Sequence, residues 1–170
     1  MPQFAEPEYE QMFGAGTYVN ATAKLYRGIK FRPGIVLFME ENTFIGDNCV
    51  ILVPHLKMFK GSQIGAGTIL AGRSEVILEE NTVIGYNCTL LTATDTPRGD
   101  YMNDASPEKE RMIIQGPIIL RKNSFVGSNV TLMPNAEIGE ASVVGAYSYI
   151  ESDIPPNHKT TRYFQSLRRR

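Results

Sequence analysis

"LRKNSFVGSNVTLMPNAEIGEASVVGAYSYI", residues 120–150, repeats an aliphatic side chain at every sixth position. With one earlier step, the series comprises Ile114, Leu120, Val126, Leu132, Ile138, Val144 and Ile150. Four positions after each of the first six, a mostly small residue recurs: Ile118, Ser124, Val130, Ala136, Ser142 and Ser148. A period of six fits neither a helix, with 3.6 residues per turn, nor a single alternating strand. It is typical of a short strand followed by a tight turn, with glycine where the chain bends.

The same period occurs earlier in the chain in three other frames. The aliphatic positions are Met39, Ile45 and Ile51, then Ile64 and Leu70, then Leu78, Ile84 and Leu90; the small positions are Thr43, Cys49, Thr68, Ser74, Thr82, Cys88 and Thr94. The frame shifts indicate insertions around 52–63, 71–77 and 96–113. Stacked units of this kind form a parallel β-helix, in which each coil buries its aliphatic side chains against the next. The sequence therefore predicts an all-β solenoid.

The predicted organisation is a β-helix domain over residues 1–153, with an inserted loop at 96–113, and a basic C-terminal tail at 154–170. Helix is expected only at 1–12 and in the final "FQSLRRR", as a short helix of the tail. At 170 residues, 42% hydrophobic and 21% charged, the chain has the size and composition of one soluble globular domain.

Charge and cysteine content exclude several classes of function. The net charge is -1, and five basic but no acidic residues follow Asp153, so residues 1–153 carry -6. This balance argues against general nucleic-acid binding. The acidic N-terminus is neither a signal nor a transit peptide, and no apolar run approaches the roughly 20 residues that span a bilayer. Cys49 and Cys88 lie in the small inward slot, which predicts packing in a cytoplasmic protein rather than a disulfide or zinc site.

Residues 84–157 carry a family resemblance, through "VIGYNCTLLTATDTP" and the hexads that close on Asp-Ile-Pro-Pro-Asn. They resemble the hexapeptide-repeat acyltransferases, and within them the maltose and galactoside O-acetyltransferases and related nucleotide-sugar acetyltransferases. The resemblance implies a left-handed β-helix, a homotrimer, acetyl-CoA as acyl donor, and active sites between subunits. It also implies backbone contacts to acyl-CoA at Ser128 and Ala146.

The chain departs from the family pattern at its catalytic position. Relatives typically read Thr-Ala-Thr-His-Pro, where His is the general base, and here Asp95 occupies the His position. The lysine that relatives often use to hold the CoA phosphate is also replaced, since Glu151 and Ser152 precede Asp-Ile-Pro-Pro. Arg162 and the terminal arginines are candidates to supply that contact. The tetrahydrodipicolinate succinyltransferases resemble this fold and also lack the His, so a missing His does not by itself abolish activity.

Asp95 differs from histidine as a base in its proton affinity. The reference pKa values of about 3.9 for Asp and about 6.5 for His differ by roughly 3.5 kcal/mol in proton affinity. This handicap matters most for a hydroxyl nucleophile and less for an amine, and burial can raise the pKa of a carboxyl group. We therefore expect an amino acceptor.

The insertion at 96–113 is polar and is expected to bind the acceptor through Arg98, Asp100 and Tyr101, the alternative being a solvated loop that caps a neighbouring subunit. His55 is expected at the surface or in a structural role, with a contribution to a neighbouring active site left open, and His158 is expected to be exposed. Two histidines cannot supply the three zinc ligands of the γ-class carbonic anhydrases, so no metal site is predicted.

Two functions compete. The first is an acyltransferase that uses acyl-CoA, with acetyl as the first candidate, to modify a sugar or nucleotide-linked amino sugar in surface-polysaccharide synthesis. The alternative is a non-catalytic β-helix scaffold or accessory protein that has lost the His base.

Overall fold

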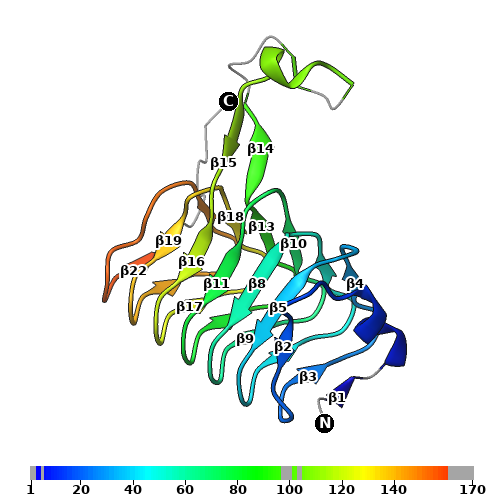
Figure 1. Cartoon of the computed structure of the whole chain (residues 1–170). Helices are drawn as coiled ribbons and strands as arrows, with labels where there is room; N and C mark the ends of the chain where they lie inside the picture. Colours follow the sequence, from blue (N-terminus) through cyan, green and yellow to red (C-terminus); the bar gives the residue numbers. More distant parts are fainter. Residues whose placement is uncertain (1–2, 5, 97–100, 103–104, 161–170) are drawn as a thin grey trace, which may run out of the picture.

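The computed structural model describes residues 3–4, 6–96, 101–102 and 105–160, and consists mainly of short parallel strands (Figure 1). The parallel strands form three sheets, which make three faces of a coiled prism that we name A, B and C. Face A contains β1 (Gln3–Phe4), β3 (Lys24–Leu25), β6 (Phe44–Ile45), β9 (Gln63–Ile64), β12 (Val83–Ile84), β17 (Phe125–Val126), β20 (Val143–Val144) and β22 (Lys159–Thr160). Face B contains β4 (Lys30–Phe31), β7 (Val50–Ile51), β10 (Ile69–Ala71), β13 (Thr89–Leu91), β18 (Thr131–Leu132) and β21 (Tyr149–Ile150). Face C contains β2 (Tyr18–Val19), β5 (Val36–Met39), β8 (His55–Met58), β11 (Val76–Leu78), β16 (Ile118–Leu120) and β19 (Glu137–Ile138).

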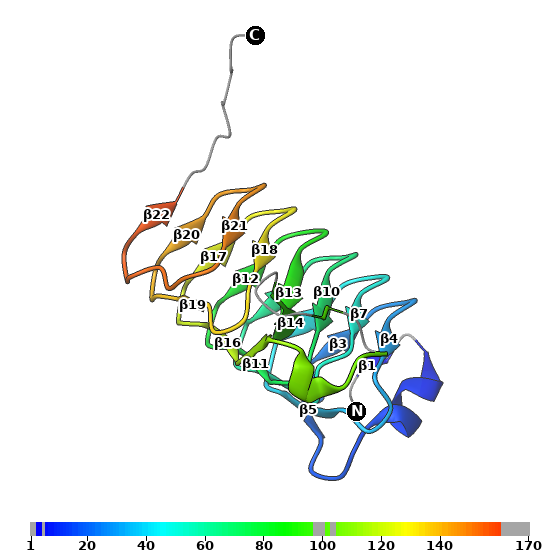
Figure 2. The same ribbon diagram turned by 90° about the horizontal axis from the view of Figure 1, so that it is seen from above.

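The chain passes from face C to A to B in each coil and then begins the next coil, as Figure 2 shows. Equivalent strands of successive coils pair in parallel and in register, so that Ile84 lies between Ile64 and Val126. The result is a solenoid of about seven turns. The predicted all-β, left-handed parallel β-helix is confirmed.

The core fills the inside of the coils with the predicted aliphatic side chains. Within the strands exposed and buried residues alternate, because successive side chains point to opposite faces of a strand. Leu120, Val126 and Leu132 are fully buried, as the repeat predicts. Each CH2 group buried in this way contributes about 0.8 kcal/mol.

The two cysteines lie inside this core. The Cys88 thiol donates to the Gly127 carbonyl at 3.1 Å, and that of Cys49 donates to the Gly65 carbonyl at 3.3 Å. Burial raises the pKa of both thiols, that of Cys49 to about 11, so both stay protonated near neutral pH. The packing role predicted from the small inward slot agrees with these contacts.

The sequence predicted that the glycine of the repeat turns the chain, and this prediction is wrong. The left-handed backbone conformation falls two positions later, usually on asparagine, as at Asn129 with φ 57°. Gly127 is needed for a different reason, since a Cβ atom there would lie 2.6 Å from the backbone nitrogen of Ala146 in the next coil. The glycine directly after the aliphatic residue therefore allows the coils to stack closely, and the turn two positions later is made by asparagine or, as at Gly67 with φ 72°, by another glycine.

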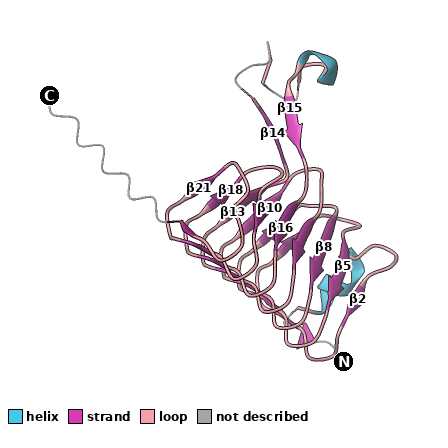
Figure 3. Cartoon of the chain, turned by 90° about the vertical axis from the view of Figure 1, so that its left-hand side faces the viewer, coloured by secondary structure: helices cyan, strands magenta, loops and turns pink. Residues whose placement is uncertain are grey.

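The predicted frame shifts around 52–63, 71–77 and 96–113 each contain a passage from face B to face C, which we call the B/C corner. At the third passage the chain leaves the coil as an antiparallel hairpin of β14 (Ala93–Asp95) and β15 (Ile113–Gln115), the arm that projects in Figure 3. Thr94 and Ile114, predicted as regular positions of the repeat, pair with each other in this hairpin instead. Ile114 is consequently 45% exposed.

The two ends of the described solenoid are built differently. At the N-terminal end, the predicted helix is a 3-10 helix, η1 (Pro7–Met12). Its Tyr9 is buried and packs edge-on against Phe31. At the other end the parallel pairing continues beyond residue 153, because β22 pairs with β20. The predicted helix in "FQSLRRR" lies outside the described residues.

None of the helices in the described part of the chain has the length and apolar character needed to cross a membrane.

Candidate active site

The arm is joined to the coil at Thr92, which is fully buried. Its hydroxyl donates to the Ala71 carbonyl at 3.2 Å and accepts from the Ser74 backbone N–H at 3.1 Å. Its own carbonyl accepts from the Gly116 N–H at 3.0 Å, at the point where the chain returns from the arm. These bonds hold the two ends of the insertion to the preceding coil, so the base of the arm has a defined geometry.

Asp95 and Arg111 form a bidentate ion pair in the arm. Arg111 Nε donates to Asp95 Oδ1 at 2.7 Å, and Nη2 donates to Oδ2 at 2.6 Å. The Arg111 side chain is 7% exposed and that of Asp95 is 22% exposed. The hairpin explains the pairing, because Asp95 opposes Ile113 in register and Arg111 lies just before that strand. Arginine presents two parallel N–H groups to a carboxylate in this geometry.

The ion pair sets the protonation of Asp95. The hydrogen bonds from Arg111 lower the pKa of Asp95 below its ordinary value, more than partial burial raises it. The charges of Arg111 and Arg73 act in the same direction. The raised pKa expected for a catalytic carboxylate is therefore not found, and Asp95 is an anion at neutral pH.

Two hollows meet at the B/C corner beside the arm. The first, about 310 Å³, is lined by Gly72, Arg73, Ala93, Thr94, Asp95, Arg111 and Ile113. Arg73 is shared with the second hollow and forms an ion pair with Glu108 of η2 (Glu108–Glu110) in the arm. A cation of the solenoid thus lies between the two hollows and is tied to the arm.

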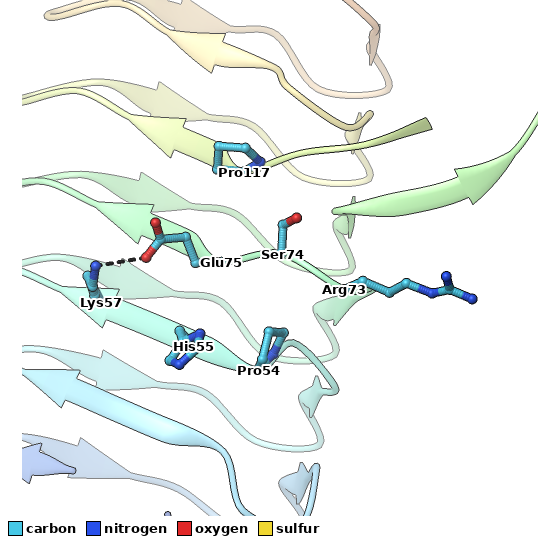
Figure 4. A pocket seen from close by; sticks show the side chains of 7 residues that line it. All are labelled: Pro54, His55, Lys57, Arg73, Ser74, Glu75 and Pro117. Atoms are coloured by element: carbon cyan, nitrogen blue, oxygen red, sulfur yellow. Dashed lines mark ion pairs between the residues drawn. The ribbon is translucent and has the colours of Figure 1, made fainter. Parts of the chain in front are cut away.

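The second hollow, about 560 Å³, lies on face C and is lined by Pro54, His55, Lys57, Arg73, Ser74, Glu75 and Pro117 (Figure 4). Leu56 and Met58 point into the core, so His55 and Lys57 must point outward from β8. Lys57 Nζ and Glu75 Oε2, from neighbouring coils, are 2.8 Å apart. In the figure Arg73 extends away from the other side chains of the hollow. The exposed position expected for His55 is found.

The structure separates the predicted donor contacts from Asp95. Ser128 and Ala146 lie side by side where the chain passes from face A to face B, which we call the A/B corner. The Ser128 hydroxyl accepts from the Tyr86 N–H at 3.2 Å, and Ala146 is exposed. Asp95 lies beyond the other end of the face B strand, so one chain alone does not bring the predicted donor and acceptor residues together.

Of the acceptor contacts predicted in the insertion, Tyr101 is 49% exposed and forms a backbone bridge with Arg111. Arg98, Asp100 and Arg162 lie outside the described residues. Among the described residues no group of three His, Cys, Asp or Glu side chains could hold a metal ion.

Sequence reasoning missed Arg111 and Arg73. The segment around Arg111 was assigned to an inserted loop, although "RMIIQ" and "TATD" at its two ends are rich in strand-forming residues that predict a hairpin. It also missed Tyr86 and Tyr147, which are 62% and 73% exposed at the A/B corner beside Ser128 and Ala146.

Comparison with known proteins supports the resemblance. Residues 117–152 match the bacterial transferase hexapeptide (six repeats) family. The chain is 28% identical over 115 residues to galactoside O-acetyltransferase of Lactococcus lactis subsp. lactis, which covers 66% of this chain and 56% of that protein. It is 46% identical over 41 residues to galactoside O-acetyltransferase of Escherichia coli, covering 24% and 20%. The chain thus spans little more than half the length of the first of these relatives, and less of the second.

Solved structures share the fold. A mutant of AntD, an N-acyltransferase from Bacillus cereus, in complex with dTDP and coenzyme A, superposes with a TM-score of 0.81 at 22% identity, covering 93% of this chain and 85% of that one. A second complex of an AntD mutant, with dTDP-4-amino-4,6-dideoxyglucose and coenzyme A, gives 0.69 at 24% identity, covering 79% and 72%. Over its C-terminal coils the chain is therefore similar in sequence to the hexapeptide-repeat transferases, and over most of its length it shares their fold.

Proposed function

We propose that the chain is an acyl-CoA-dependent acyltransferase that moves an acyl group, with acetyl as the first candidate, to a sugar or a nucleotide-linked amino sugar. The observation that carries this proposal is the 28% identity to a galactoside O-acetyltransferase, which extends over 115 residues of the chain. AntD, whose complexes contain a dTDP-linked amino sugar and coenzyme A, supports the acceptor class through a shared fold. A role in surface-polysaccharide synthesis and a cytoplasmic location belong to the same proposal.

Asp95 fits acceptor recognition better than proton abstraction. A general base works best when its pKa is close to the operating pH, and the ion pair with Arg111 moves the pKa of Asp95 away from that range. A fixed carboxylate can accept hydrogen bonds from sugar hydroxyls and attract a protonated amine. We therefore assign to Asp95 the binding and orientation of the acceptor, with Tyr101, Arg98 and Asp100 of the insertion as further candidates.

The donor is assigned to the A/B corner. Ser128 and Ala146 offer backbone groups along the coil edge, and the exposed rings of Tyr86 and Tyr147 provide flat surfaces for the adenine of acyl-CoA. Arg162 and the terminal arginines are candidates for its phosphates. Because the A/B and B/C corners are at opposite ends of face B, this assignment needs a second copy of the chain, and we propose a homotrimer in which the donor corner of one copy meets the acceptor corner of the next.

A non-catalytic scaffold is the second candidate, and one observation favours it. Both oxygens of Asp95, in the position that relatives give to their base, are engaged by Arg111. A carboxylate used in this way can be a structural part of the arm and nothing more.

Acyl transfer to a panel of sugars separates the two functions. Purified protein is incubated with acetyl-CoA and amino or hydroxyl sugars, free and nucleotide-linked, while thiol release is followed, and acetyl-CoA binding is measured by calorimetry. The transferase predicts turnover with at least one acceptor. Asp95→Asn should raise the acceptor KM at least tenfold and leave the Kd for acetyl-CoA unchanged. The control Asp47→Asn, at an exposed carboxylate that accepts from the Arg27 N–H, should change neither. Absence of both turnover and acetyl-CoA binding would overturn the transferase and favour the scaffold.

A further inference from the structure

We propose that His55 is the catalytic base of the acyl transfer and that the hollow on face C holds the reacting end of the acceptor. This inference rests on the proposed transferase function. It assigns to the protein a base that lies two coils away from the position where relatives keep theirs.

The position of His55 is rigid and outward. It is the first residue of β8, which pairs with β5 on one side and β11 on the other. Leu56 and Met58 of the same strand are fully buried and anchor it to the core. The imidazole therefore projects from a fixed backbone into the hollow of about 560 Å³, a size within the roughly 300–1,000 Å³ range of ligand sites.

The groups around His55 suit a sugar. The register places Glu75 beside it on the next coil and Val36 beside it on the preceding coil. The charged groups that face it are thus Glu75 and Lys57, which pair with each other at 2.8 Å, with Arg73 at the corner. Paired charges and a serine hydroxyl can exchange hydrogen bonds with sugar hydroxyls, and the rings of Pro54 and Pro117 offer apolar surface.

His55 and Asp95 are spaced to share one acceptor. Glu75 lies one coil from His55, and Pro117, where the chain re-enters the coils from the arm, lies one coil further. At about 4.8 Å per strand, two coils separate the imidazole from the base of the arm by roughly 10 Å along the solenoid axis. Arg73 lines both hollows, so they adjoin at the corner. Asp95 lies three residues out along the arm from Thr92, so an acceptor that uses both groups must be longer than one hexose. A nucleotide-linked sugar bound across both hollows can contact Asp95 at one end and present the nucleophile of its sugar to His55 at the other.

Histidine is also the side-chain type whose protonation ordinarily changes near neutral pH. The chain has two histidines, and the other, His158, has its Nδ1 2.8 Å from the Pro156 carbonyl near the C-terminal end of the described coils. His55 is accordingly the imidazole available at the acceptor hollows. Because it can serve a hydroxyl nucleophile as well as an amine, the expected restriction to amino acceptors no longer follows.

The reaction balances as follows. The acceptor nitrogen or oxygen attacks the thioester carbonyl carbon, a C–N or C–O bond forms, and the proton of the nucleophile passes to the imidazole nitrogen of His55. The tetrahedral intermediate then collapses, the C–S bond breaks, and the imidazolium returns its proton to the departing thiolate. The products are the acylated sugar and free CoA, and the imidazole is neutral again.

The test compares His55→Asn with the control His158→Asn in the full chain, with acetyl-CoA and the acceptor panel. His55→Asn should lower kcat on the order of 10²–10⁴-fold, with the Kd for acetyl-CoA unchanged. His158→Asn should retain the wild-type kcat and KM. Because His55 is exposed, a loss of folding is not expected, and circular dichroism checks this.

Two outcomes overturn the inference in different ways. If wild-type protein turns over and His55→Asn retains the wild-type kcat, the transferase stands and His55 is not the base. If wild-type protein neither turns over any acceptor nor binds acetyl-CoA, the proposed function fails and His55 fails with it.

Discussion

Mixing two inactive variants tests whether each active site is shared between two copies. Asp95→Asn removes the acceptor carboxylate at the B/C corner, and Ala146→Trp places a bulky ring at the A/B corner. Ala146 is exposed and tolerates the change, whereas Asp95→Asn loses the charge of the ion pair and keeps one oxygen that can accept from Arg111, so hydrogen exchange must show that the arm stays folded. The two corners lie at opposite ends of face B, so one site needs an intact B/C corner from one copy and an intact A/B corner from its neighbour.

The magnitude follows from random assembly. Equal amounts of the two variants are unfolded and refolded together. A site is then intact when the copy that supplies its B/C corner is Ala146→Trp and the copy that supplies its A/B corner is Asp95→Asn. Each condition is met with a probability of one half, so about a quarter of the sites of a cyclic trimer are restored. If both residues served a site within one chain, no mixed assembly would contain an intact site.

The assay follows thiol release at an acceptor concentration well below KM, where each variant alone retains less than about a tenth of wild-type activity. We expect the refolded mixture to reach about a quarter of wild-type activity and the unmixed controls to stay at their own low rates. Sedimentation analysis confirms that mixture and controls have the same assembly state. A mixture no more active than the average of the two variants would refute the shared site.

Three further predictions concern single contacts. Because Arg111 lowers the pKa of Asp95, the ion pair stabilises the arm above the ordinary pKa of Asp, and this stabilisation is lost as pH falls through the lowered pKa. Hydrogen exchange in the arm of the wild-type protein should therefore become faster only in acid. In Arg111→Gln it should be fast at neutral pH as well. Tyr9→Phe removes a hydroxyl that donates to one backbone carbonyl at 3.0 Å and accepts from one buried N–H at 2.8 Å, so urea unfolding should show a loss of about 1–3 kcal/mol. Ser124→Ala removes a buried hydroxyl that has no hydrogen-bond partner among the described residues, so it should leave stability unchanged or raise it by about 1 kcal/mol. Ser142→Ala breaks a 2.6 Å hydrogen bond to the Pro155 carbonyl and should lower stability by a similar amount.

The coils could be predicted because every repeat places an aliphatic side chain at the same position, where it must be buried. An aliphatic side chain at every sixth position can be buried only if the chain turns three times per coil, and the buried residues Leu120, Val126 and Leu132 follow that pattern. The role of Gly127 could not be predicted in the same way. Its requirement comes from the backbone of Ala146 in the next coil, and this distance exists only after the coils have stacked.

The site could be predicted only in part, for a related reason. Asp95 was found because it occupies a recognisable position at the end of a repeat. Arg111 lies 16 residues later, and only the hairpin brings its guanidinium to the carboxylate. That long-range contact reverses the expected direction of the pKa of Asp95, which single-residue reasoning based on burial had placed too high.

The place of the candidate site follows from how a solenoid uses its backbone. The N–H and C=O groups of the strands on the faces form hydrogen bonds with the coils above and below, so an extra residue in a strand would break hydrogen bonds on both sides. A corner can lengthen without that loss, and the frame shifts of this chain occur at the B/C corner in three successive coils. His55 lies in the first, Arg73 lies in the second, and Asp95 lies immediately before the third. Side chains that the repeat does not need for packing thus collect along one edge, and the positions where the six-residue period fails are the positions where chemistry is to be sought.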